Sequence, residues 1–244
     1  MMKFISACVL SAMCAWPVFG AERQRFVSGP AQVSMIELFT SEGCSSCPPA
    51  EAYLNGLQNE PGLWTKYIPL AFHVDYWNYL GWKDRFSDAA YSARQRQYAR
   101  ERLMLTVYTP AFFVNGEPWR PQRHPDIPLS DTRVGKLTVD VIGTQYRAVF
   151  ELAESNSKAL QLNVALLGMG LTTNIRAGEN AGRQAQHDFV VLSWQRFESD
   201  DGRWRGALPA PALARDTSRL ALVAWVSKLD NPTPLQAVGG YLAR

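Results

Sequence analysis

Two cysteines, Cys44 and Cys47, lie three positions apart where a strand-like segment gives way to a helical one. Residues 32–40 form a nearly continuous apolar run, which is typical of a strand buried on both faces. After the cysteines, Pro48-Pro49 and apolar residues at helical spacing predict a helix that ends near residues 59–62. A helix start carries unpaired N–H groups and the positive end of the helix dipole, so it stabilises a thiolate. We therefore expect Cys44 to be an exposed nucleophile and Cys47 a partly buried resolving thiol, in exchange through a mixed disulfide.

The first 21 residues have the pattern of a cleaved secretory signal peptide. Lys3 precedes an apolar run over residues 4–15, and cleavage fits after Gly20 or Ala21. The run is shorter than the roughly 20 residues that a membrane-spanning helix needs. We therefore expect a periplasmic or secreted protein with no membrane span after cleavage of the signal peptide.

The cysteine count and the net charge narrow the classes of function. Cys8 and Cys14 lie in the predicted signal peptide, so the exported protein keeps only Cys44 and Cys47. Such a closely spaced pair fits a redox site better than a framework of structural disulfides. The net charge of +3 at pH 7, with no run of Lys or Arg, argues against nucleic acid as a partner. The expected partners are protein thiols or disulfides and a redox partner still to be identified.

The residues that follow the cysteines predict an α/β domain over residues 30–120. A second strand pattern covers residues 67–74, and a strand, a helix and a second strand predict a βαβ unit with parallel strands. Residues 84–102 predict an inserted helix, with an arginine-rich side from Arg94 to Arg102 that we expect to face solvent. Residues 107–114 predict a third strand.

The second half of the chain has a different pattern. Residues 118–130 contain four prolines and predict a linker. Residues 131–244 then predict a β-rich, antiparallel, sandwich-like domain, because short strand-like runs alternate with turns. Within it we interpret residues 178–183 as a turn between strands. The following His187-Asp188 has no visible nucleophile partner, and we assign it no catalytic role.

Thr109-Pro110 lies near the start of the predicted third strand and is the second motif that points to a function. Residues 109–116 closely resemble a segment of periplasmic disulfide oxidoreductases. Together with residues 37–50, 73–78 and 178–188, they resemble the thioredoxin superfamily and, more narrowly, the secreted thioredoxin-like family catalogued as domain of unknown function 1223. The resemblance covers nearly the whole mature chain. It implies a thioredoxin-like fold in which a cis Thr109–Pro110 bond lies against the dithiol and the adjacent backbone pairs with an extended substrate peptide.

The same resemblance implies that acidic and aromatic side chains lie near the dithiol. Thioredoxins carry a buried acid six residues before the first cysteine, a position that is Leu38 here. Glu37 replaces it as the proton acceptor only if a β-bulge intervenes. Asp75 and Trp77 follow the second strand at the edge of the sheet that holds the dithiol, and we expect them to line a substrate groove together with Thr109-Pro110. Their alternative role is to pack the inserted helix onto the sheet.

Three other roles for the cysteines stay open. The pair could be an inert disulfide in a redox-inactive, protein-binding module. It could hold zinc, with His73, His124 and His187 as the available ligands to complete a set of four, or copper(I), with His73 as a third ligand. We favour an exported thiol–disulfide oxidoreductase with no metal and no organic cofactor, because the sulfur atoms themselves carry the electrons.

Overall fold

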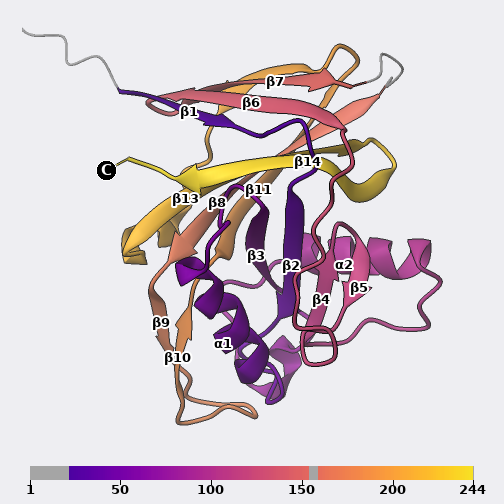
Figure 1. The fold of residues 1–244 in the computed structure, drawn as a ribbon. Coiled ribbons are helices and arrows are strands. Elements are labelled where there is room, and N and C mark those ends of the chain that lie inside the picture. Colours follow the sequence, from indigo (N-terminus) through magenta and orange to yellow (C-terminus); the bar gives the residue numbers. More distant parts are fainter. Residues whose placement is uncertain (1–21, 154–158, 244) are drawn as a thin grey trace, which may run out of the picture.

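A mixed sheet of eight strands organises the chain, and two helices pack against it (Figure 1). The computed structural model describes residues 22–153 and 159–243, and the predicted signal peptide lies outside these ranges. In spatial order the strands of this sheet are β14 (Asn231–Tyr241), β13 (Arg219–Lys228), β8 (Leu160–Met169), β11 (Val190–Ser199), β3 (Tyr67–His73), β2 (Ser34–Thr40), β4 (Ala111–Val114) and β5 (Glu117–Trp119).

The predicted βαβ unit is confirmed. The parallel strands β2 and β3 are connected by α1 (Pro48–Gly56), which a 3-10 turn over Leu57–Asn59 continues. The third predicted strand is shorter than expected and corresponds to β4, which is antiparallel to β2. The second helix, α2 (Ala89–Glu101), begins later than the sequence predicts, because the Asp88 side chain accepts a hydrogen bond from the Ala90 N–H and caps the helix there. Further 3-10 turns cover Asn78–Leu80 and Ala212–Asp216.

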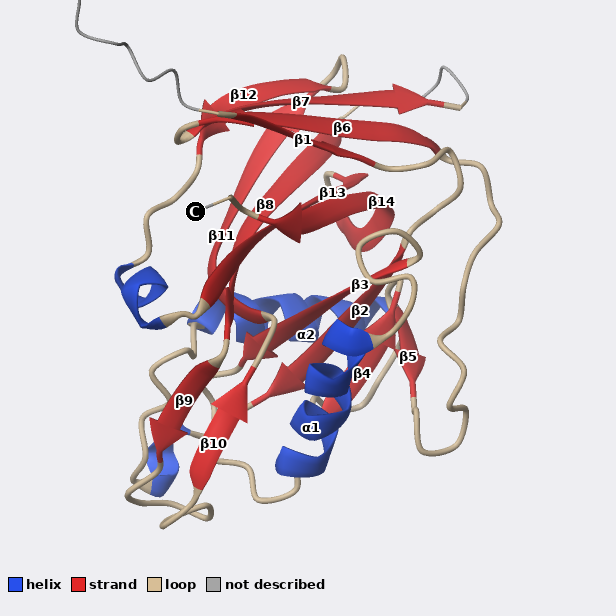
Figure 2. Ribbon diagram, turned by 60° about the vertical axis from the view of Figure 1, so that its left-hand side comes forward, coloured by secondary structure: helices blue, strands red, loops and turns tan. Residues whose placement is uncertain are grey.

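The two helices contact opposite faces of β2. Successive side chains of a strand point to opposite faces, and in β2 the Thr40 hydroxyl bonds Glu51 of α1, whereas Glu37 bonds Arg94 of α2. Figure 2 shows α1 in front of this part of the sheet and α2 behind it. The register of β2 against β3 runs without a shift, so no bulge moves Glu37 to the α1 face.

The two predicted domains share one sheet. Strand β11 from the second half pairs in parallel with β3 at Val190 and Ala71, and it pairs along its length with β8 in the antiparallel sense. The main hydrophobic cluster likewise joins residues of both halves, such as Phe72 and Trp225. The chain therefore does not separate into two cores at the predicted linker, whose first residues belong to β5.

A second sheet packs against the first and forms the sandwich-like part of the structure that the sequence predicted. This sheet contains β1 (Arg23–Val27), β6 (Gly135–Ile142), β7 (Gln145–Leu152) and β12 (Arg203–Ala207), in that order. Its apolar side chains pack onto those of β8, β13 and β14 in a second buried cluster. The sequence did not predict β1 or its place beside β6.

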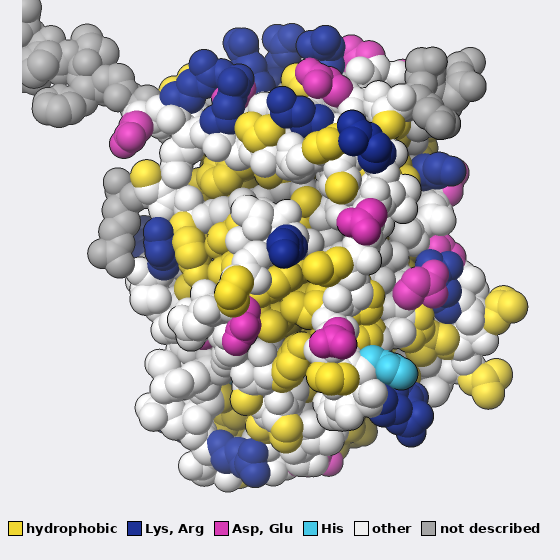
Figure 3. Space-filling model, in the orientation of Figure 1, with side chains coloured by type: hydrophobic (Ala, Val, Ile, Leu, Met, Phe, Trp, Pro, Cys, Tyr) yellow, Lys and Arg dark blue, Asp and Glu magenta, His cyan; other side chains and the backbone are white. Residues whose placement is uncertain are grey.

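The outer face of the second sheet is basic. Figure 3 shows Lys and Arg side chains gathered at the top of the molecule, over this sheet. Among the exposed residues of its strands are Arg23, Arg25, Lys136, Arg147, Arg203 and Arg205. Within the described ranges, no helix combines the length and the apolar character that crossing a membrane requires.

Candidate redox site

Cys44 and Cys47 form a disulfide at the start of α1. Cys47 is the N-cap of the helix, immediately before Pro48, so both sulfurs lie at its amino-terminal end. The predicted exposure of Cys44 is wrong, because only 1% of Cys44 and none of Cys47 is accessible. The two serines between them are exposed, so the disulfide lies directly beneath the surface.

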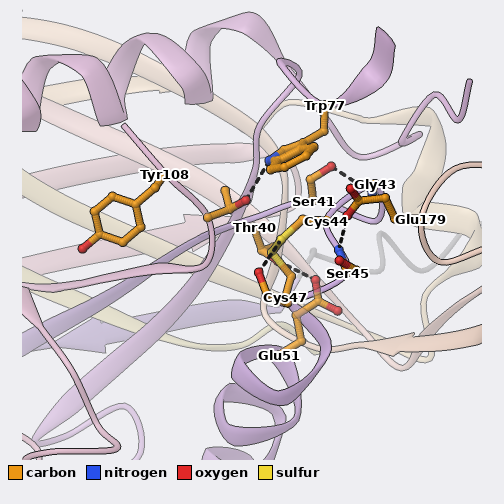
Figure 4. The surroundings of a disulfide bond; sticks show 12 residues. Thr40, Ser41, Gly43, Cys44, Ser45, Cys47, Glu51, Trp77, Tyr108 and Glu179 are labelled. Atoms are coloured by element: carbon orange, nitrogen blue, oxygen red, sulfur yellow. Dashed lines mark hydrogen bonds between the residues drawn. A yellow bond between two sulfur atoms is a disulfide. The ribbon is translucent and has the colours of Figure 1, made fainter. Parts of the chain in front are cut away.

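The Trp77 side chain lies beside the disulfide. Figure 4 shows its ring on one side of Cys44 and Cys47, with Glu51 on the other. Trp77 packs against the turn before Cys44, since a Cβ atom on Gly43 would lie 3.1 Å from the Trp77 Cβ. Its Nε1 donates a hydrogen bond to the Thr109 Oγ1 at 2.7 Å. Trp77 therefore links the dithiol turn to the loop that begins β4.

The Thr109–Pro110 peptide bond is cis, as the resemblance implies. Both residues are half-buried and directly precede β4. Asp75, also half-buried, is held at the end of β3 by Ser92 of α2, whose hydroxyl bonds both the Asp75 N–H and its carboxylate. The structure thus joins Trp77 to Thr109 by a hydrogen bond and fixes Asp75 against α2.

The hairpin of β9 (Leu171–Asn174) and β10 (Gln184–His187) reaches the dithiol turn from the second half of the chain. Residues 178–183 form the turn between these strands, as predicted. The turn also holds the cysteine segment: Glu179 accepts a hydrogen bond from the Ser45 N–H at 3.0 Å. Asn180 donates to the carbonyl oxygens of Glu42 and Cys44, each at 2.9 Å. Sequence analysis missed these contacts, because a turn pattern gives no information about the segment that it covers.

Glu37 does not lie at the dithiol. Its carboxylate is fully buried on the α2 face of β2, where it pairs with Arg94 and lies 2.6 Å from the Tyr98 hydroxyl. The prediction that Arg94 faces solvent is also wrong, since Arg94 is 3% exposed. The buried carboxylate beside the cysteines is Glu51, one turn into α1, whose backbone N–H donates to the Cys47 carbonyl.

Glu51 belongs to a buried histidine–carboxylate cluster, which we define as Glu42, Glu51, His73, Asp84 and His187. The His187 ring lies between two carboxylates, with Nε2 3.2 Å from Glu42 and Nδ1 3.3 Å from Glu51. The His73 Nδ1 lies 2.7 Å from Asp84. The two imidazole rings are 5.2 Å apart, centroid to centroid.

The charges of the cluster depend on one another. Burial opposes the charge of His187, but its hydrogen bonds to Glu42 and Glu51 and their negative charges raise its pKa to about 10. Burial alone would raise the pKa of Glu51, but the hydrogen bond and charge of His187 bring that pKa below its usual value. His187, to which the sequence assigned no catalytic role, is therefore the main counter-charge of Glu51.

Removing the Trp77 side chain should open the disulfide to reagents. In Trp77→Ala the hydrogen bond to Thr109 is lost, and a bond of this kind contributes about 1 kcal/mol to the closed form. We therefore expect reduction by dithiothreitol to become about fivefold faster. The measurement is the rate of thiol release in native buffer, with Trp77→Phe as the matched variant that keeps the ring and loses the hydrogen bond. Equal rates in the wild type and Trp77→Ala would contradict this expectation.

Two solved structures share this fold. Protein AGR_C_4864 from Agrobacterium tumefaciens superposes with a TM-score of 0.59 at 22% sequence identity, over 86% of this chain and 94% of that one. HBP35 of Porphyromonas gingivalis superposes with a TM-score of 0.55 at 14% identity, over 88% of this chain and 76% of that one. The comparison with curated proteins gave no match. Residues 35–227 match a family profile described as "Protein of unknown function (DUF1223)".

Proposed function

Because the chain belongs to the DUF1223 family, whose function is unknown, we propose its function from the site itself: an exported thiol–disulfide oxidoreductase that uses Cys44 and Cys47. The observation that carries this proposal is the Cys44–Cys47 disulfide at the start of α1, linked through Trp77 to the cis Thr109–Pro110 loop.

Cys44 is the proposed attacking thiol. It is covered by the exposed Ser45-Ser46 turn, and the Ser46 Oγ lies 3.3 Å from its sulfur, where the hydroxyl can donate to a thiolate. The positive end of the α1 dipole further favours the thiolate. In the reduced protein, Cys44 attacks a substrate disulfide and releases one substrate thiolate. Cys47 then attacks the mixed disulfide, so the substrate leaves fully reduced and the Cys44–Cys47 disulfide forms; the reverse sequence oxidises a substrate dithiol.

The loop before β4 is the proposed substrate contact. An extended substrate peptide would pair with the backbone next to Pro110 as an added strand. Trp77 would move when a substrate sulfur reaches Cys44, because Figure 4 shows its ring beside the disulfide. The amino-terminal signal pattern supports a periplasmic or secreted location, where substrate disulfides are present.

Catalysis of disulfide exchange tests the proposal. We expect the wild type to accelerate insulin reduction, or the oxidative refolding of a reduced multi-disulfide protein, and Cys44→Ala/Cys47→Ala to give only the background rate. Equilibration with glutathione buffers gives the reduction potential of the pair: a value near −120 mV indicates an oxidant and one near −270 mV a reductant. If the wild type matches the double variant in both assays, the disulfide is structural and the proposal fails.

A further inference from the structure

We infer that Glu51, His73 and His187 form a binding site for one divalent metal ion of the zinc class. The three residues come from α1, β3 and β10, and one ligand atom from each lies within 4.8 Å of the other two. Two imidazole nitrogens and one carboxylate oxygen are a ligand set that zinc uses in proteins. This set contains neither cysteine, so it differs from the metal sites that the sequence alone suggested.

His73 supplies an independent indication of a missing ligand. It is 1% exposed, and its Nε2 has no hydrogen-bond partner among the described residues. Its Nδ1 lies 2.7 Å from Asp84, so a proton on Nδ1 leaves the Nε2 lone pair free to bind. Buried polar atoms without a partner are uncommon in folded proteins and call for an explanation such as a bound ion.

Both histidines are oriented as metal-binding histidines are. In such sites the ring nitrogen that does not touch the metal usually donates to a carboxylate. The cluster provides this arrangement twice, with Asp84 on His73 and Glu42 on His187. The Asp84 carboxylate is fixed in turn by the backbone N–H groups of Glu42 and Phe86, each at 2.9 Å.

The charge of the cluster also favours a cation. Three buried carboxylates face two histidines, so the cluster stays negative even when one imidazole is protonated. Uncompensated buried charge is costly, and a divalent cation would balance it. On binding, the metal would take the place of the His187 Nδ1 proton beside Glu51, and that proton would be released to solvent.

A cavity gives the site an entrance and an open coordination position. It has a volume of about 410 Å³ and lies between α1 and the β9–β10 hairpin, which Figure 2 shows beside each other. Glu42, Glu51 and His187 are among its lining residues. A metal with three protein ligands could therefore keep a water molecule as its fourth ligand on the cavity side, as in catalytic zinc sites.

Zinc titration of the oxidised, chelator-stripped protein tests this inference, because the disulfide removes both thiols as ligands. We expect one Zn²⁺ per chain, and at least about tenfold weaker binding in His73→Ala and in His187→Ala, since even supporting residues of metal sites contribute that much. His124→Ala is the matched control: His124 is exposed and outside the cluster, so its removal should leave the affinity unchanged.

A second measurement, made on the wild type, tests the inference even if the histidine variants do not fold. Co²⁺ added to the oxidised wild type should give the visible absorption of a four- or five-coordinate site without a thiolate charge-transfer band. Far-UV circular dichroism identifies the variants that are folded and can be compared. The inference is overturned if the oxidised wild type binds no Zn²⁺ and gives no such Co²⁺ spectrum, or if folded His73→Ala and His187→Ala bind Zn²⁺ as the wild type does. The redox assays above do not depend on this result.

Discussion

Replacing Arg94 by methionine is expected to lower the free energy of unfolding by about 3–5 kcal/mol. The change leaves the fully buried carboxylate of Glu37 without its cation. In the wild type the guanidinium makes two contacts with that carboxylate, at 2.5 Å and 3.0 Å. It also donates to the Pro232 carbonyl of β14 at 3.3 Å, so α2, β2 and β14 all lose a contact. Urea unfolding monitored by circular dichroism gives the free energy.

The double variant Glu37→Met/Arg94→Met is the control for this prediction. Removing both charges avoids an unpaired buried ion, and replacement of a buried ion pair by apolar groups is often close to neutral. We therefore expect the double variant to be more stable than Arg94→Met. The reduction potential of the disulfide should not change in it, because Glu37 lies on the α2 face and the dithiol on the α1 side. A loss below about 1 kcal/mol in Arg94→Met would show that the ion pair contributes little.

Substituting either cysteine should abolish turnover, but only one variant should trap the substrate. In Cys47→Ser the attacking thiol remains and the resolving thiol is absent, so a mixed disulfide with the substrate accumulates on Cys44. In Cys44→Ser we expect exchange at the background rate and no trapped complex, because the Ser46 hydroxyl that can donate to a thiolate lies at the Cys44 sulfur.

Non-reducing electrophoresis and mass spectrometry of the trapped species measure this difference. A reducible adduct in Cys47→Ser that is absent from Cys44→Ser supports the assignment. An adduct of equal yield in Cys44→Ser would reverse the roles of the two thiols while leaving the exchange chemistry in place.

Local patterns predicted the βαβ unit and the dithiol well, because each depends on residues that are close in sequence. The strands β2 and β3 are continuous apolar runs, and Pro48 marks the helix start. Successive side chains of a strand point to opposite faces, and Glu37 therefore lies on the α2 face of β2, away from the dithiol. The helix boundary at Asp88 was missed because the residues before it have helical composition but form a turn.

Long-range pairing could not be predicted in the same way. An apolar pattern predicts that a segment is a strand, but it does not predict which strand pairs with it. The pairing of β11 with β3 was therefore not predicted. Strand β14 was missed because Pro232, Pro234 and two glycines near its end indicate turns, although an edge strand tolerates proline. His187 reaches Glu42 across 145 positions of sequence, and no local signal could connect them.

Because β11 pairs in parallel with β3, the first half of the chain is not structurally independent of the second half. A fragment ending at the proline-rich segment would uncover the edge of β3 and would lose Trp225 from the main hydrophobic cluster. Uncovered strand edges promote aggregation. The first half of the chain therefore depends on the second half for its sheet edge and its core. We expect gene fusion or duplication to transfer the cysteine pair only together with the β-rich half that supports it.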